Sequence, residues 1–173
     1  MKQSLCHCFI LSLYATTAGF AFAMFEGPLS PFDWGVKRFD RKKRNADTLK
    51  AMIGLIERYK PQAIIIEDAI AIDSRRVARI RRLYNGLIVW AEAHGIAVHR
   101  YGRSQIRQTF ARFGGTTKDD IALIIAKTIP SFEHRRPPLR QPWMSEDARM
   151  WLFDAVALAF TYFHLDAVPE RQL

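Results

Sequence analysis

The sequence has little cysteine and few acidic residues. Its two cysteines, Cys6 and Cys8, are too close for an easy mutual disulfide, so we expect two free thiols and a reducing, intracellular compartment. No second cluster of Cys or His completes the set of about four ligands that a structural zinc ion needs. Only 17 Asp and Glu oppose 26 Lys and Arg, and the net charge of +9 favours a polyanionic partner such as nucleic acid.

Internal repeats and low-complexity tracts are also absent. The length of 173 residues and the 49% hydrophobic content fit one globular domain over residues 1–173, and we expect no membrane partner. The N-terminus leaves two interpretations open. Lys2, an apolar run and "AFA" are typical of a secretory signal peptide that ends near residue 23. Alternatively, "FILSLY" and "FAFAMFE" form two strands joined by a turn at "ATTAG".

Beyond residue 30, strand and helix patterns alternate. The sequence predicts strands at 32–39, 63–67 and 96–101, and helices that end at Lys60, run from Ser74 to Gly95, and cover 116–129 and 146–163. Three prolines and three arginines indicate an exposed loop at 133–144 before the last helix. With the two N-terminal strands, this order predicts an α/β fold with a mixed β-sheet of about five strands flanked by helices.

Two acids lie in apolar surroundings. Glu67 ends the buried strand "AIIIE", and Asp154 is the only charged residue between Met150 and Phe163. A buried carboxylate is costly unless a cation, a hydrogen-bond donor or a metal compensates its charge. Because ligands gather at the carboxyl ends of central strands, we expect Glu67 and Asp154 to converge on one or two Mg²⁺ ions, with Mn²⁺ as a substitute.

Such a metal site has a definite chemistry and a simpler alternative. Two ions about 3.5 to 4 Å apart would activate water and stabilise the leaving oxygen of a phosphodiester. In the alternative, Glu67 accepts backbone N–H groups and Asp154 pairs with an arginine. Asp147 lies two helical turns before Asp154, on nearly the same face, and is a third candidate ligand. Glu146 is expected to be solvated at the helix start, where the helix dipole favours acids.

Basic residues form a second candidate set. The segment "SRRVARIRR" repeats arginine at helical spacing, opposite the apolar face. This pattern predicts a series of phosphate contacts that position DNA without reading its sequence, although a solvated helix face is an equal alternative. The candidate DNA-binding residues are Arg75, Arg76, Arg79, Arg82 and Arg103.

Several segments together resemble a known family. The succession "ILSLY-ATTAGFAF", "AIIIEDA", "VHRYGRSQIRQTF", "TTKDDIALIIA" and "DAVALAF" resembles the RuvC-type Holliday-junction resolvases of the RNase H-like nuclease superfamily, from about residue 9 to 164. The resemblance implies an RNase H-like fold and a cytoplasmic, Mg²⁺-dependent, structure-selective endonuclease. It would act as a homodimer on branched DNA, a four-way junction, in recombination and repair. In that family Glu67 and Asp154 would hold metal, and Lys118 would contact the phosphate backbone.

The sequence departs from the family at two positions. The first strand of such resolvases normally ends with a catalytic Asp, but here Leu13 or Tyr14 takes that place and neither can bind a metal ion. Three residues before Asp154, where the family often has Asp or His, this chain has Trp151, so Asp147 is the substitute that remains.

The missing acid leaves three interpretations open. The protein is a catalytically impaired DNA-binding protein on the same fold, or Asp33 or Glu26 replaces the missing ligand, or a start-site or frame error has altered the N-terminal sequence. A secreted basic protein with an N-terminal signal peptide is a weaker alternative.

Overall fold

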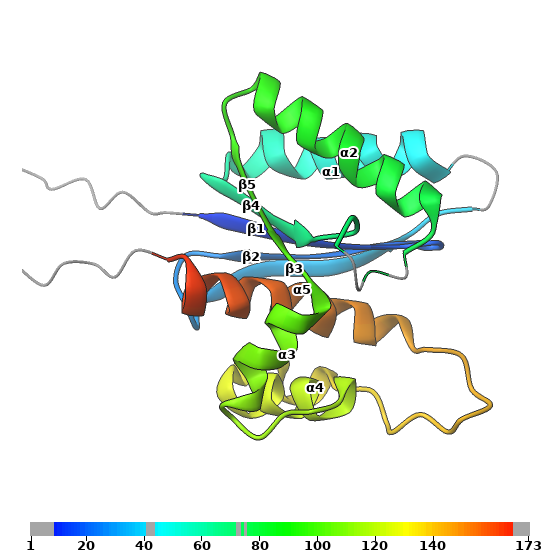
Figure 1. Cartoon of the computed structure of the whole chain (residues 1–173), viewed down its shortest axis with the longest axis vertical. Helices are drawn as coiled ribbons and strands as arrows, with labels where there is room; N and C mark the ends of the chain where they lie inside the picture. Colours follow the sequence, from blue (N-terminus) through cyan, green and yellow to red (C-terminus); the bar gives the residue numbers. More distant parts are fainter. Residues whose placement is uncertain (1–8, 41–43, 72–73, 75, 168–173) are drawn as a thin grey trace, which may run out of the picture.

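The computed structural model describes residues 9–40, 44–71, 74 and 76–167. Its centre is a five-stranded sheet in the order β3-β2-β1-β4-β5 (Figure 1). The strands are β1 (Ile10–Thr16), β2 (Gly19–Phe25), β3 (Pro31–Arg38), β4 (Ala63–Glu67) and β5 (Ala97–Tyr101). The helices are α1 (Arg44–Tyr59), α2 (Ala78–Ala93), α3 (Arg103–Ala111), α4 (Lys118–Thr128) and α5 (Ala148–Leu165), with a 3₁₀ helix, η1, at Pro130–Arg135.

The sheet is mixed, as the sequence predicts. β1, β2 and β3 pair antiparallel, whereas β1, β4 and β5 run parallel. The turn between β1 and β2 requires Gly19, which has a φ of +154° and where a Cβ would lie 1.9 Å from the Lys37 carbonyl oxygen of β3. Because β1 and β4 are parallel neighbours, their carboxyl ends meet at one edge of the sheet, where ligand sites of such folds form.

Helices cover both faces of the sheet. α1 and α2 lie on one face, and α5 crosses the other, with α3 and α4 packed beyond it (Figure 1). Side chains of β1 alternate, so Leu13 joins the apolar cluster under α1 and α2, and Tyr14 joins the cluster under α5. In β4, Ile66 joins the cluster under α1 and α2, and Ile65 joins the cluster under α5. The alternation therefore brings Glu67 to the same face as Tyr14.

The first two strands decide between the interpretations of the N-terminus. Every residue of β2 is buried, and β1 lies inside the sheet between β2 and β4. Cleavage after residue 23 would remove β1 and most of β2, so the signal-peptide alternative is incompatible with this fold. Cys6 and Cys8 lie outside the described residues. None of the helices in the described part of the chain combines the length and apolarity needed to cross a bilayer.

α2 and α5 begin later than the sequence predicts. α2 begins at Ala78 rather than Ser74, and Ser74, Arg76 and Val77 belong to no helix or strand. α5 begins after Asp147 rather than after Ser145, because the Asp147 carboxylate accepts the Arg149 backbone N–H at 2.9 Å and caps the helix. The patterns also miss α3 altogether. All three differences affect residues around the candidate site.

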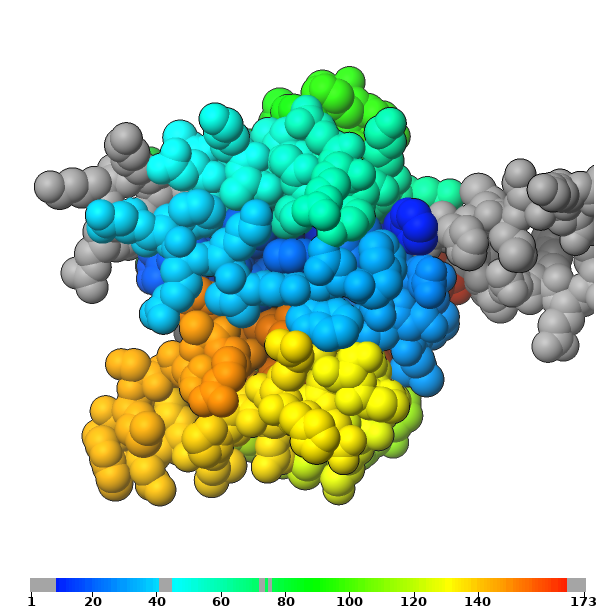
Figure 2. Space-filling model, turned by 180° about the vertical axis from the view of Figure 1, so that it is seen from behind, coloured from blue at the N-terminus to red at the C-terminus, as the bar shows by residue number. Residues whose placement is uncertain are grey.

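The loop predicted at 133–144 overlaps η1 at its first three residues. From residue 136 to 147 the chain forms no regular helix or strand. Leu139 and Trp143 are 70% and 81% exposed there. Figure 2 shows this part of the chain, yellow to orange, at the surface beside the sheet.

Candidate functional site

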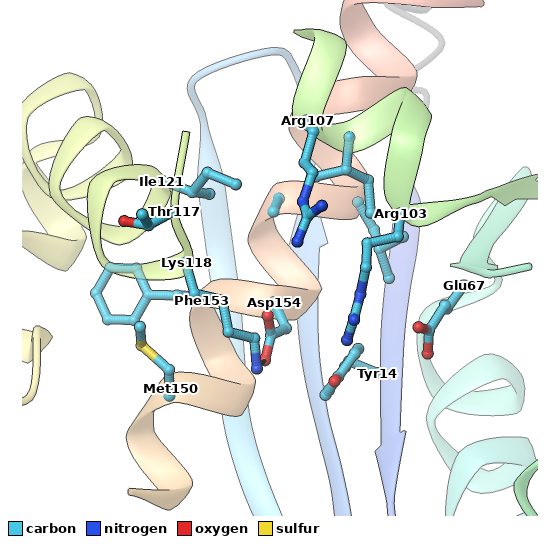
Figure 3. A pocket seen from close by; sticks show the side chains of 13 residues that line it. Tyr14, Glu67, Arg103, Arg107, Thr117, Lys118, Ile121, Met150, Phe153 and Asp154 are labelled. Carbon is cyan, nitrogen blue, oxygen red and sulfur yellow. Dashed lines mark ion pairs between the residues drawn. The ribbon is translucent and has the colours of Figure 1, made fainter. Parts of the chain in front are cut away.

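A cavity of about 240 Å³ lies at the carboxyl ends of β1 and β4, under α3, α4 and α5 (Figure 3). Each of these elements contributes a side chain that can take part in chemistry. The relevant lining residues are Tyr14, Glu67, Arg103, Arg107, Lys118 and Asp154. The cavity therefore combines both acids in apolar surroundings with three cations.

Glu67 ends β4 and forms an ion pair with Arg76. The Arg76 Nε atom lies 2.9 Å from Glu67 Oε2, and the two side chains are only 20% and 11% exposed. Arg76 also donates a hydrogen bond to the Ala15 carbonyl oxygen just after Tyr14, which ties it to β1. Burial raises the pKa of Glu67, while Arg76 and then Arg103 oppose the shift. The pair thus compensates part of the cost of burying the carboxylate.

Asp154 pairs with a different cation. The Lys118 Nζ atom lies 2.9 Å from Asp154 Oδ2, and it also donates a hydrogen bond to Glu146. The Asp154 side chain is 15% exposed. Burial raises the pKa of Asp154 to about 7, with Lys118 acting against the shift. Burial and Lys118 therefore act on the pKa of the Asp154 carboxyl group in opposite directions.

Figure 3 shows Tyr14 between Glu67 on one side and Asp154 with Lys118 on the other. The Arg76 guanidinium carbon is 5.0 Å and the Lys118 Nζ atom 5.7 Å from the centroid of its ring. Burial, reinforced by Asp154, raises the pKa of Tyr14 above the physiological range, so the phenol stays neutral. We refer to Glu67, Arg76, Tyr14, Lys118 and Asp154, in this order, as the Tyr14 bridge.

The end of β1 is held in place by a second tyrosine. The Ala15 backbone N–H donates to the Tyr84 hydroxyl of α2 at 2.8 Å. Tyr84 is 2% exposed, so this hydrogen bond is shielded from water. The contact fixes the strand end that presents Tyr14 to the cavity.

Asp147 does not line this cavity. It precedes the first helical residue of α5 in extended backbone conformation, so it does not share a helix face with Asp154. The Arg149 guanidinium donates to its carboxylate at 2.6 Å, which lowers the pKa of Asp147. Glu146, which the sequence places in solvent at the helix start, contacts Lys118 instead.

The other proposed substitutes also lie elsewhere. Asp33 of β3 accepts a hydrogen bond from the Tyr59 hydroxyl of α1, on the face of the sheet opposite α5. Glu26 follows β2 beside the amino end of β1, where Phe25 pairs with Ile10. Neither residue can therefore supply the acid that β1 lacks at its carboxyl end.

The predicted arginine series does not form one surface. Arg76 pairs with Glu67, Arg79 donates to the Asn45 side chain of α1 at 3.0 Å, and Arg82 is exposed to solvent. Arg75 lies outside the described residues. The series divides because Arg76 precedes α2 and does not follow its helical spacing.

Two arginines of α3 are better placed. Arg103 and Arg107 lie one helical turn apart and point into the cavity (Figure 3). Neither has an ion-pair partner among the described residues. Arg107 is not among the predicted site residues. The available signal was the spacing of Ile106 and Phe110, which repeats that of the arginines and indicates a short amphipathic helix.

These residues do not fit a centre with two metal ions. Within the described ranges, no group of three or more His, Cys, Asp or Glu side chains converges. The buried Glu67 Oε2 and Asp154 Oδ2 atoms accept no hydrogen bond, which a metal ligand could explain. Each of them, however, lies 2.9 Å from a protein cation. The neutral ring of Tyr14 lies between Glu67 and Asp154. A centre with two metal ions would need a carboxylate at this position instead.

Comparisons of sequence and of structure both find similarity to RuvC of Thermus thermophilus. No family model matches the chain. The crossover junction endodeoxyribonuclease RuvC of Thermus thermophilus is 24% identical over 112 residues, which is 64% of this chain. The chain spans 60% of the length of this curated relative.

Solved structures match over more of the chain. RuvC of Thermus thermophilus in complex with a Holliday junction substrate has a TM-score of 0.62 at 16% identity, covering 90% of this chain and 92% of that one. The yeast mitochondrial Holliday junction resolvase Ydc2 has a TM-score of 0.60 at 13% identity, covering 89% and 77%. The chain therefore has the RNase H-like fold of RuvC and other Holliday-junction resolvases, which confirms the predicted fold. Nucleases of the RuvC type generally use divalent metal ions.

Proposed function

We propose that this chain binds branched DNA, with the four-way junction as its preferred form, and acts in cytoplasmic DNA recombination or repair. The observation that carries the proposal is the pair Arg103 and Arg107, two cations without ionic partners in the described residues that point into the cavity. Guanidinium groups bind phosphate in a bidentate manner. A homodimer would present two such cavities to two strands of a junction.

Two similar proteins support a second activity on the same DNA. RuvC is named as a crossover junction endodeoxyribonuclease, and Ydc2 as a Holliday junction resolvase. If this chain also cuts, Mg²⁺ or Mn²⁺ is the expected ion, and Glu67 and Asp154 are the acids that would hold it. The ion would first have to displace Arg76 and Lys118 from them.

The Tyr14 bridge favours the catalytically impaired DNA-binding protein between these two candidates. The strand-end position that would need a carboxylate carries a neutral ring, and each acid already has a cation at 2.9 Å. Asp147, the remaining candidate ligand, is bound by Arg149 outside the cavity. Junction binding with little or no strand cleavage is thus the function that the geometry supports best.

One assay separates the candidates. Purified protein is mixed with a labelled four-way junction or a duplex of the same sequence, in Mg²⁺, Mn²⁺ or EDTA, and both binding and incision are measured. Tighter binding to the junction, without incision, supports the proposal. Incision that Glu67→Gln abolishes establishes the endonuclease instead. Equal binding to junction and duplex overturns the proposed preference for branched DNA.

The salt dependence of binding tests the two arginines. Removing two phosphate contacts with Arg103→Ala and Arg107→Ala should lower the slope of log affinity against log salt by about 2. Arg112→Ala is the matched control, because Arg112 lies at the end of the same helix but outside the cavity. An equal change in slope for the control would contradict the assignment.

A further inference from the structure

We infer that the cavity holds a DNA phosphate without a divalent metal ion, because Arg76 and Lys118 already supply the positive charge that metal ions supply in nucleases of this fold. The inference rests on the proposed function and specifies how the same site works. It concerns the Tyr14 bridge and the two arginines of α3.

The first step is the charge on the two acids. Glu67 and Asp154 each lie 2.9 Å from one cation, and their side chains are 11% and 15% exposed. In so little solvent, an ionised carboxylate needs a compensating charge nearby. Arg76 and Lys118 supply part of this compensating charge from within the protein.

The second step is the position of the cations. Both approach the Tyr14 ring, at 5.0 and 5.7 Å from its centroid, within the range of cation–π attraction. Arg76 is also hydrogen-bonded to the Ala15 carbonyl oxygen, so its guanidinium is tied to the backbone of β1. A metal ion would have to break these contacts as well as the ion pairs. The Tyr14 bridge therefore holds both cations against the two acids.

The third step is the charge left for a ligand. Once Arg76 and Lys118 are paired with the acids, Arg103 and Arg107 remain uncompensated in the lining. Both point into the cavity from one face of α3 (Figure 3). An anionic phosphodiester fits this excess of positive charge, whereas a free divalent cation is repelled by it.

The first test measures metal and DNA separately. Mn²⁺ binding to the free protein is followed by calorimetry, and junction affinity is measured in EDTA and in Mg²⁺ at constant ionic strength, since ions also screen charge. We expect no Mn²⁺ binding at the site and junction affinities within about twofold of each other. Mn²⁺ binding that Glu67→Gln removes, or a loss of junction affinity of about tenfold or more in EDTA, overturns the inference.

A pair of variants makes the test specific to Tyr14. Tyr14→Asp places a carboxylate beside Glu67 and Asp154 and should create Mn²⁺ binding, whereas Tyr14→Phe keeps the ring and should bind none. Mn²⁺ binding by the Phe variant would contradict the role of the ring. If the Asp variant fails to fold, Mn²⁺ binding and junction affinity of the wild type still test the inference. Failure to bind any junction would refute the proposed function. The Mn²⁺ measurement would still show whether Glu67 and Asp154 bind a metal ion.

Discussion

Asp154→Asn tests the electrostatics of the site most directly. Burial raises the pKa of Asp154 from 3.8 to about 7, with Lys118 opposing the shift. Above neutral pH the folded protein therefore holds a buried carboxylate that the unfolded chain exposes to water. Asn keeps the shape of the side chain and removes its charge, while Lys118 retains Glu146 as a partner.

The sign of the effect follows from proton binding. Because the folded-state pKa is raised, the folded protein binds more protons than the unfolded chain between about pH 4 and 7. The wild type should gain stability as pH falls through 7 and gain no more from this group below about 4. At about 1.36 kcal/mol for each pKa unit, the cost of ionised Asp154 is on the order of 4 kcal/mol at full titration.

The assay is urea unfolding of both proteins at a series of pH values in EDTA. Asp154→Asn should be more stable than the wild type by up to about 4 kcal/mol near pH 8, and the difference should vanish as pH approaches about 4. Glu67 also has a raised pKa, but its titration is common to both proteins and cancels in the difference.

A control of opposite sign is available on α4. Hydrogen bonds from Thr117 and Thr116 lower the pKa of Asp120 to about 2. Asp120→Asn should therefore destabilise the protein at neutral pH, with the loss disappearing as pH falls toward 2. If Asp154→Asn is less stable than the wild type near pH 8, or if its effect does not change with pH, the ion pair with Lys118 outweighs burial and the reasoning is refuted.

Two further substitutions test how β1 is held. Tyr84→Phe leaves the Ala15 N–H without its acceptor and should cost about 1–3 kcal/mol in urea unfolding; an unchanged midpoint would show that water replaces the hydroxyl. Gly19→Ala places a Cβ 1.9 Å from the Lys37 carbonyl oxygen at a φ of +154°, so it should lower the unfolding free energy by more than about 2 kcal/mol. A wild-type melting temperature for this variant would contradict the described turn.

The sequence alone predicted most of the fold, because the patterns involved are local. The apolar run that ends in Glu67 indicates a buried strand, and the apolar stretch around Asp154 indicates a buried helix. Both residues do line one cavity, while their role as metal ligands stays a prediction. The sequence patterns did not predict α3, because a nine-residue helix with two spaced apolar residues gives only a weak periodic signal.

Which side chains share the site depended on tertiary structure. A shift of helix start from Ser145 to Asp147 moves Asp147 off the helix and leaves Glu146 in contact with Lys118. Side chains project at fixed angles of about 100° per residue only within the helix. A residue that precedes the helix, such as Asp147, therefore does not point where helical spacing predicts. The sequence predicted Arg76 as part of a helical series of arginines, but Arg76 precedes α2 and pairs with Glu67.

The sequence by itself determined that the carboxyl end of the first strand carries no acid, since Leu13 and Tyr14 were the only residues in question. It could not decide which of the two faces the site. That choice depends on strand register, because neighbouring side chains point to opposite faces and a slip of one residue exchanges them. Pairing of Leu13 with Ile66 of β4 sets the register and turns Tyr14 toward α5. Long-range pairing thus placed a neutral ring between two cations, which no local pattern specifies.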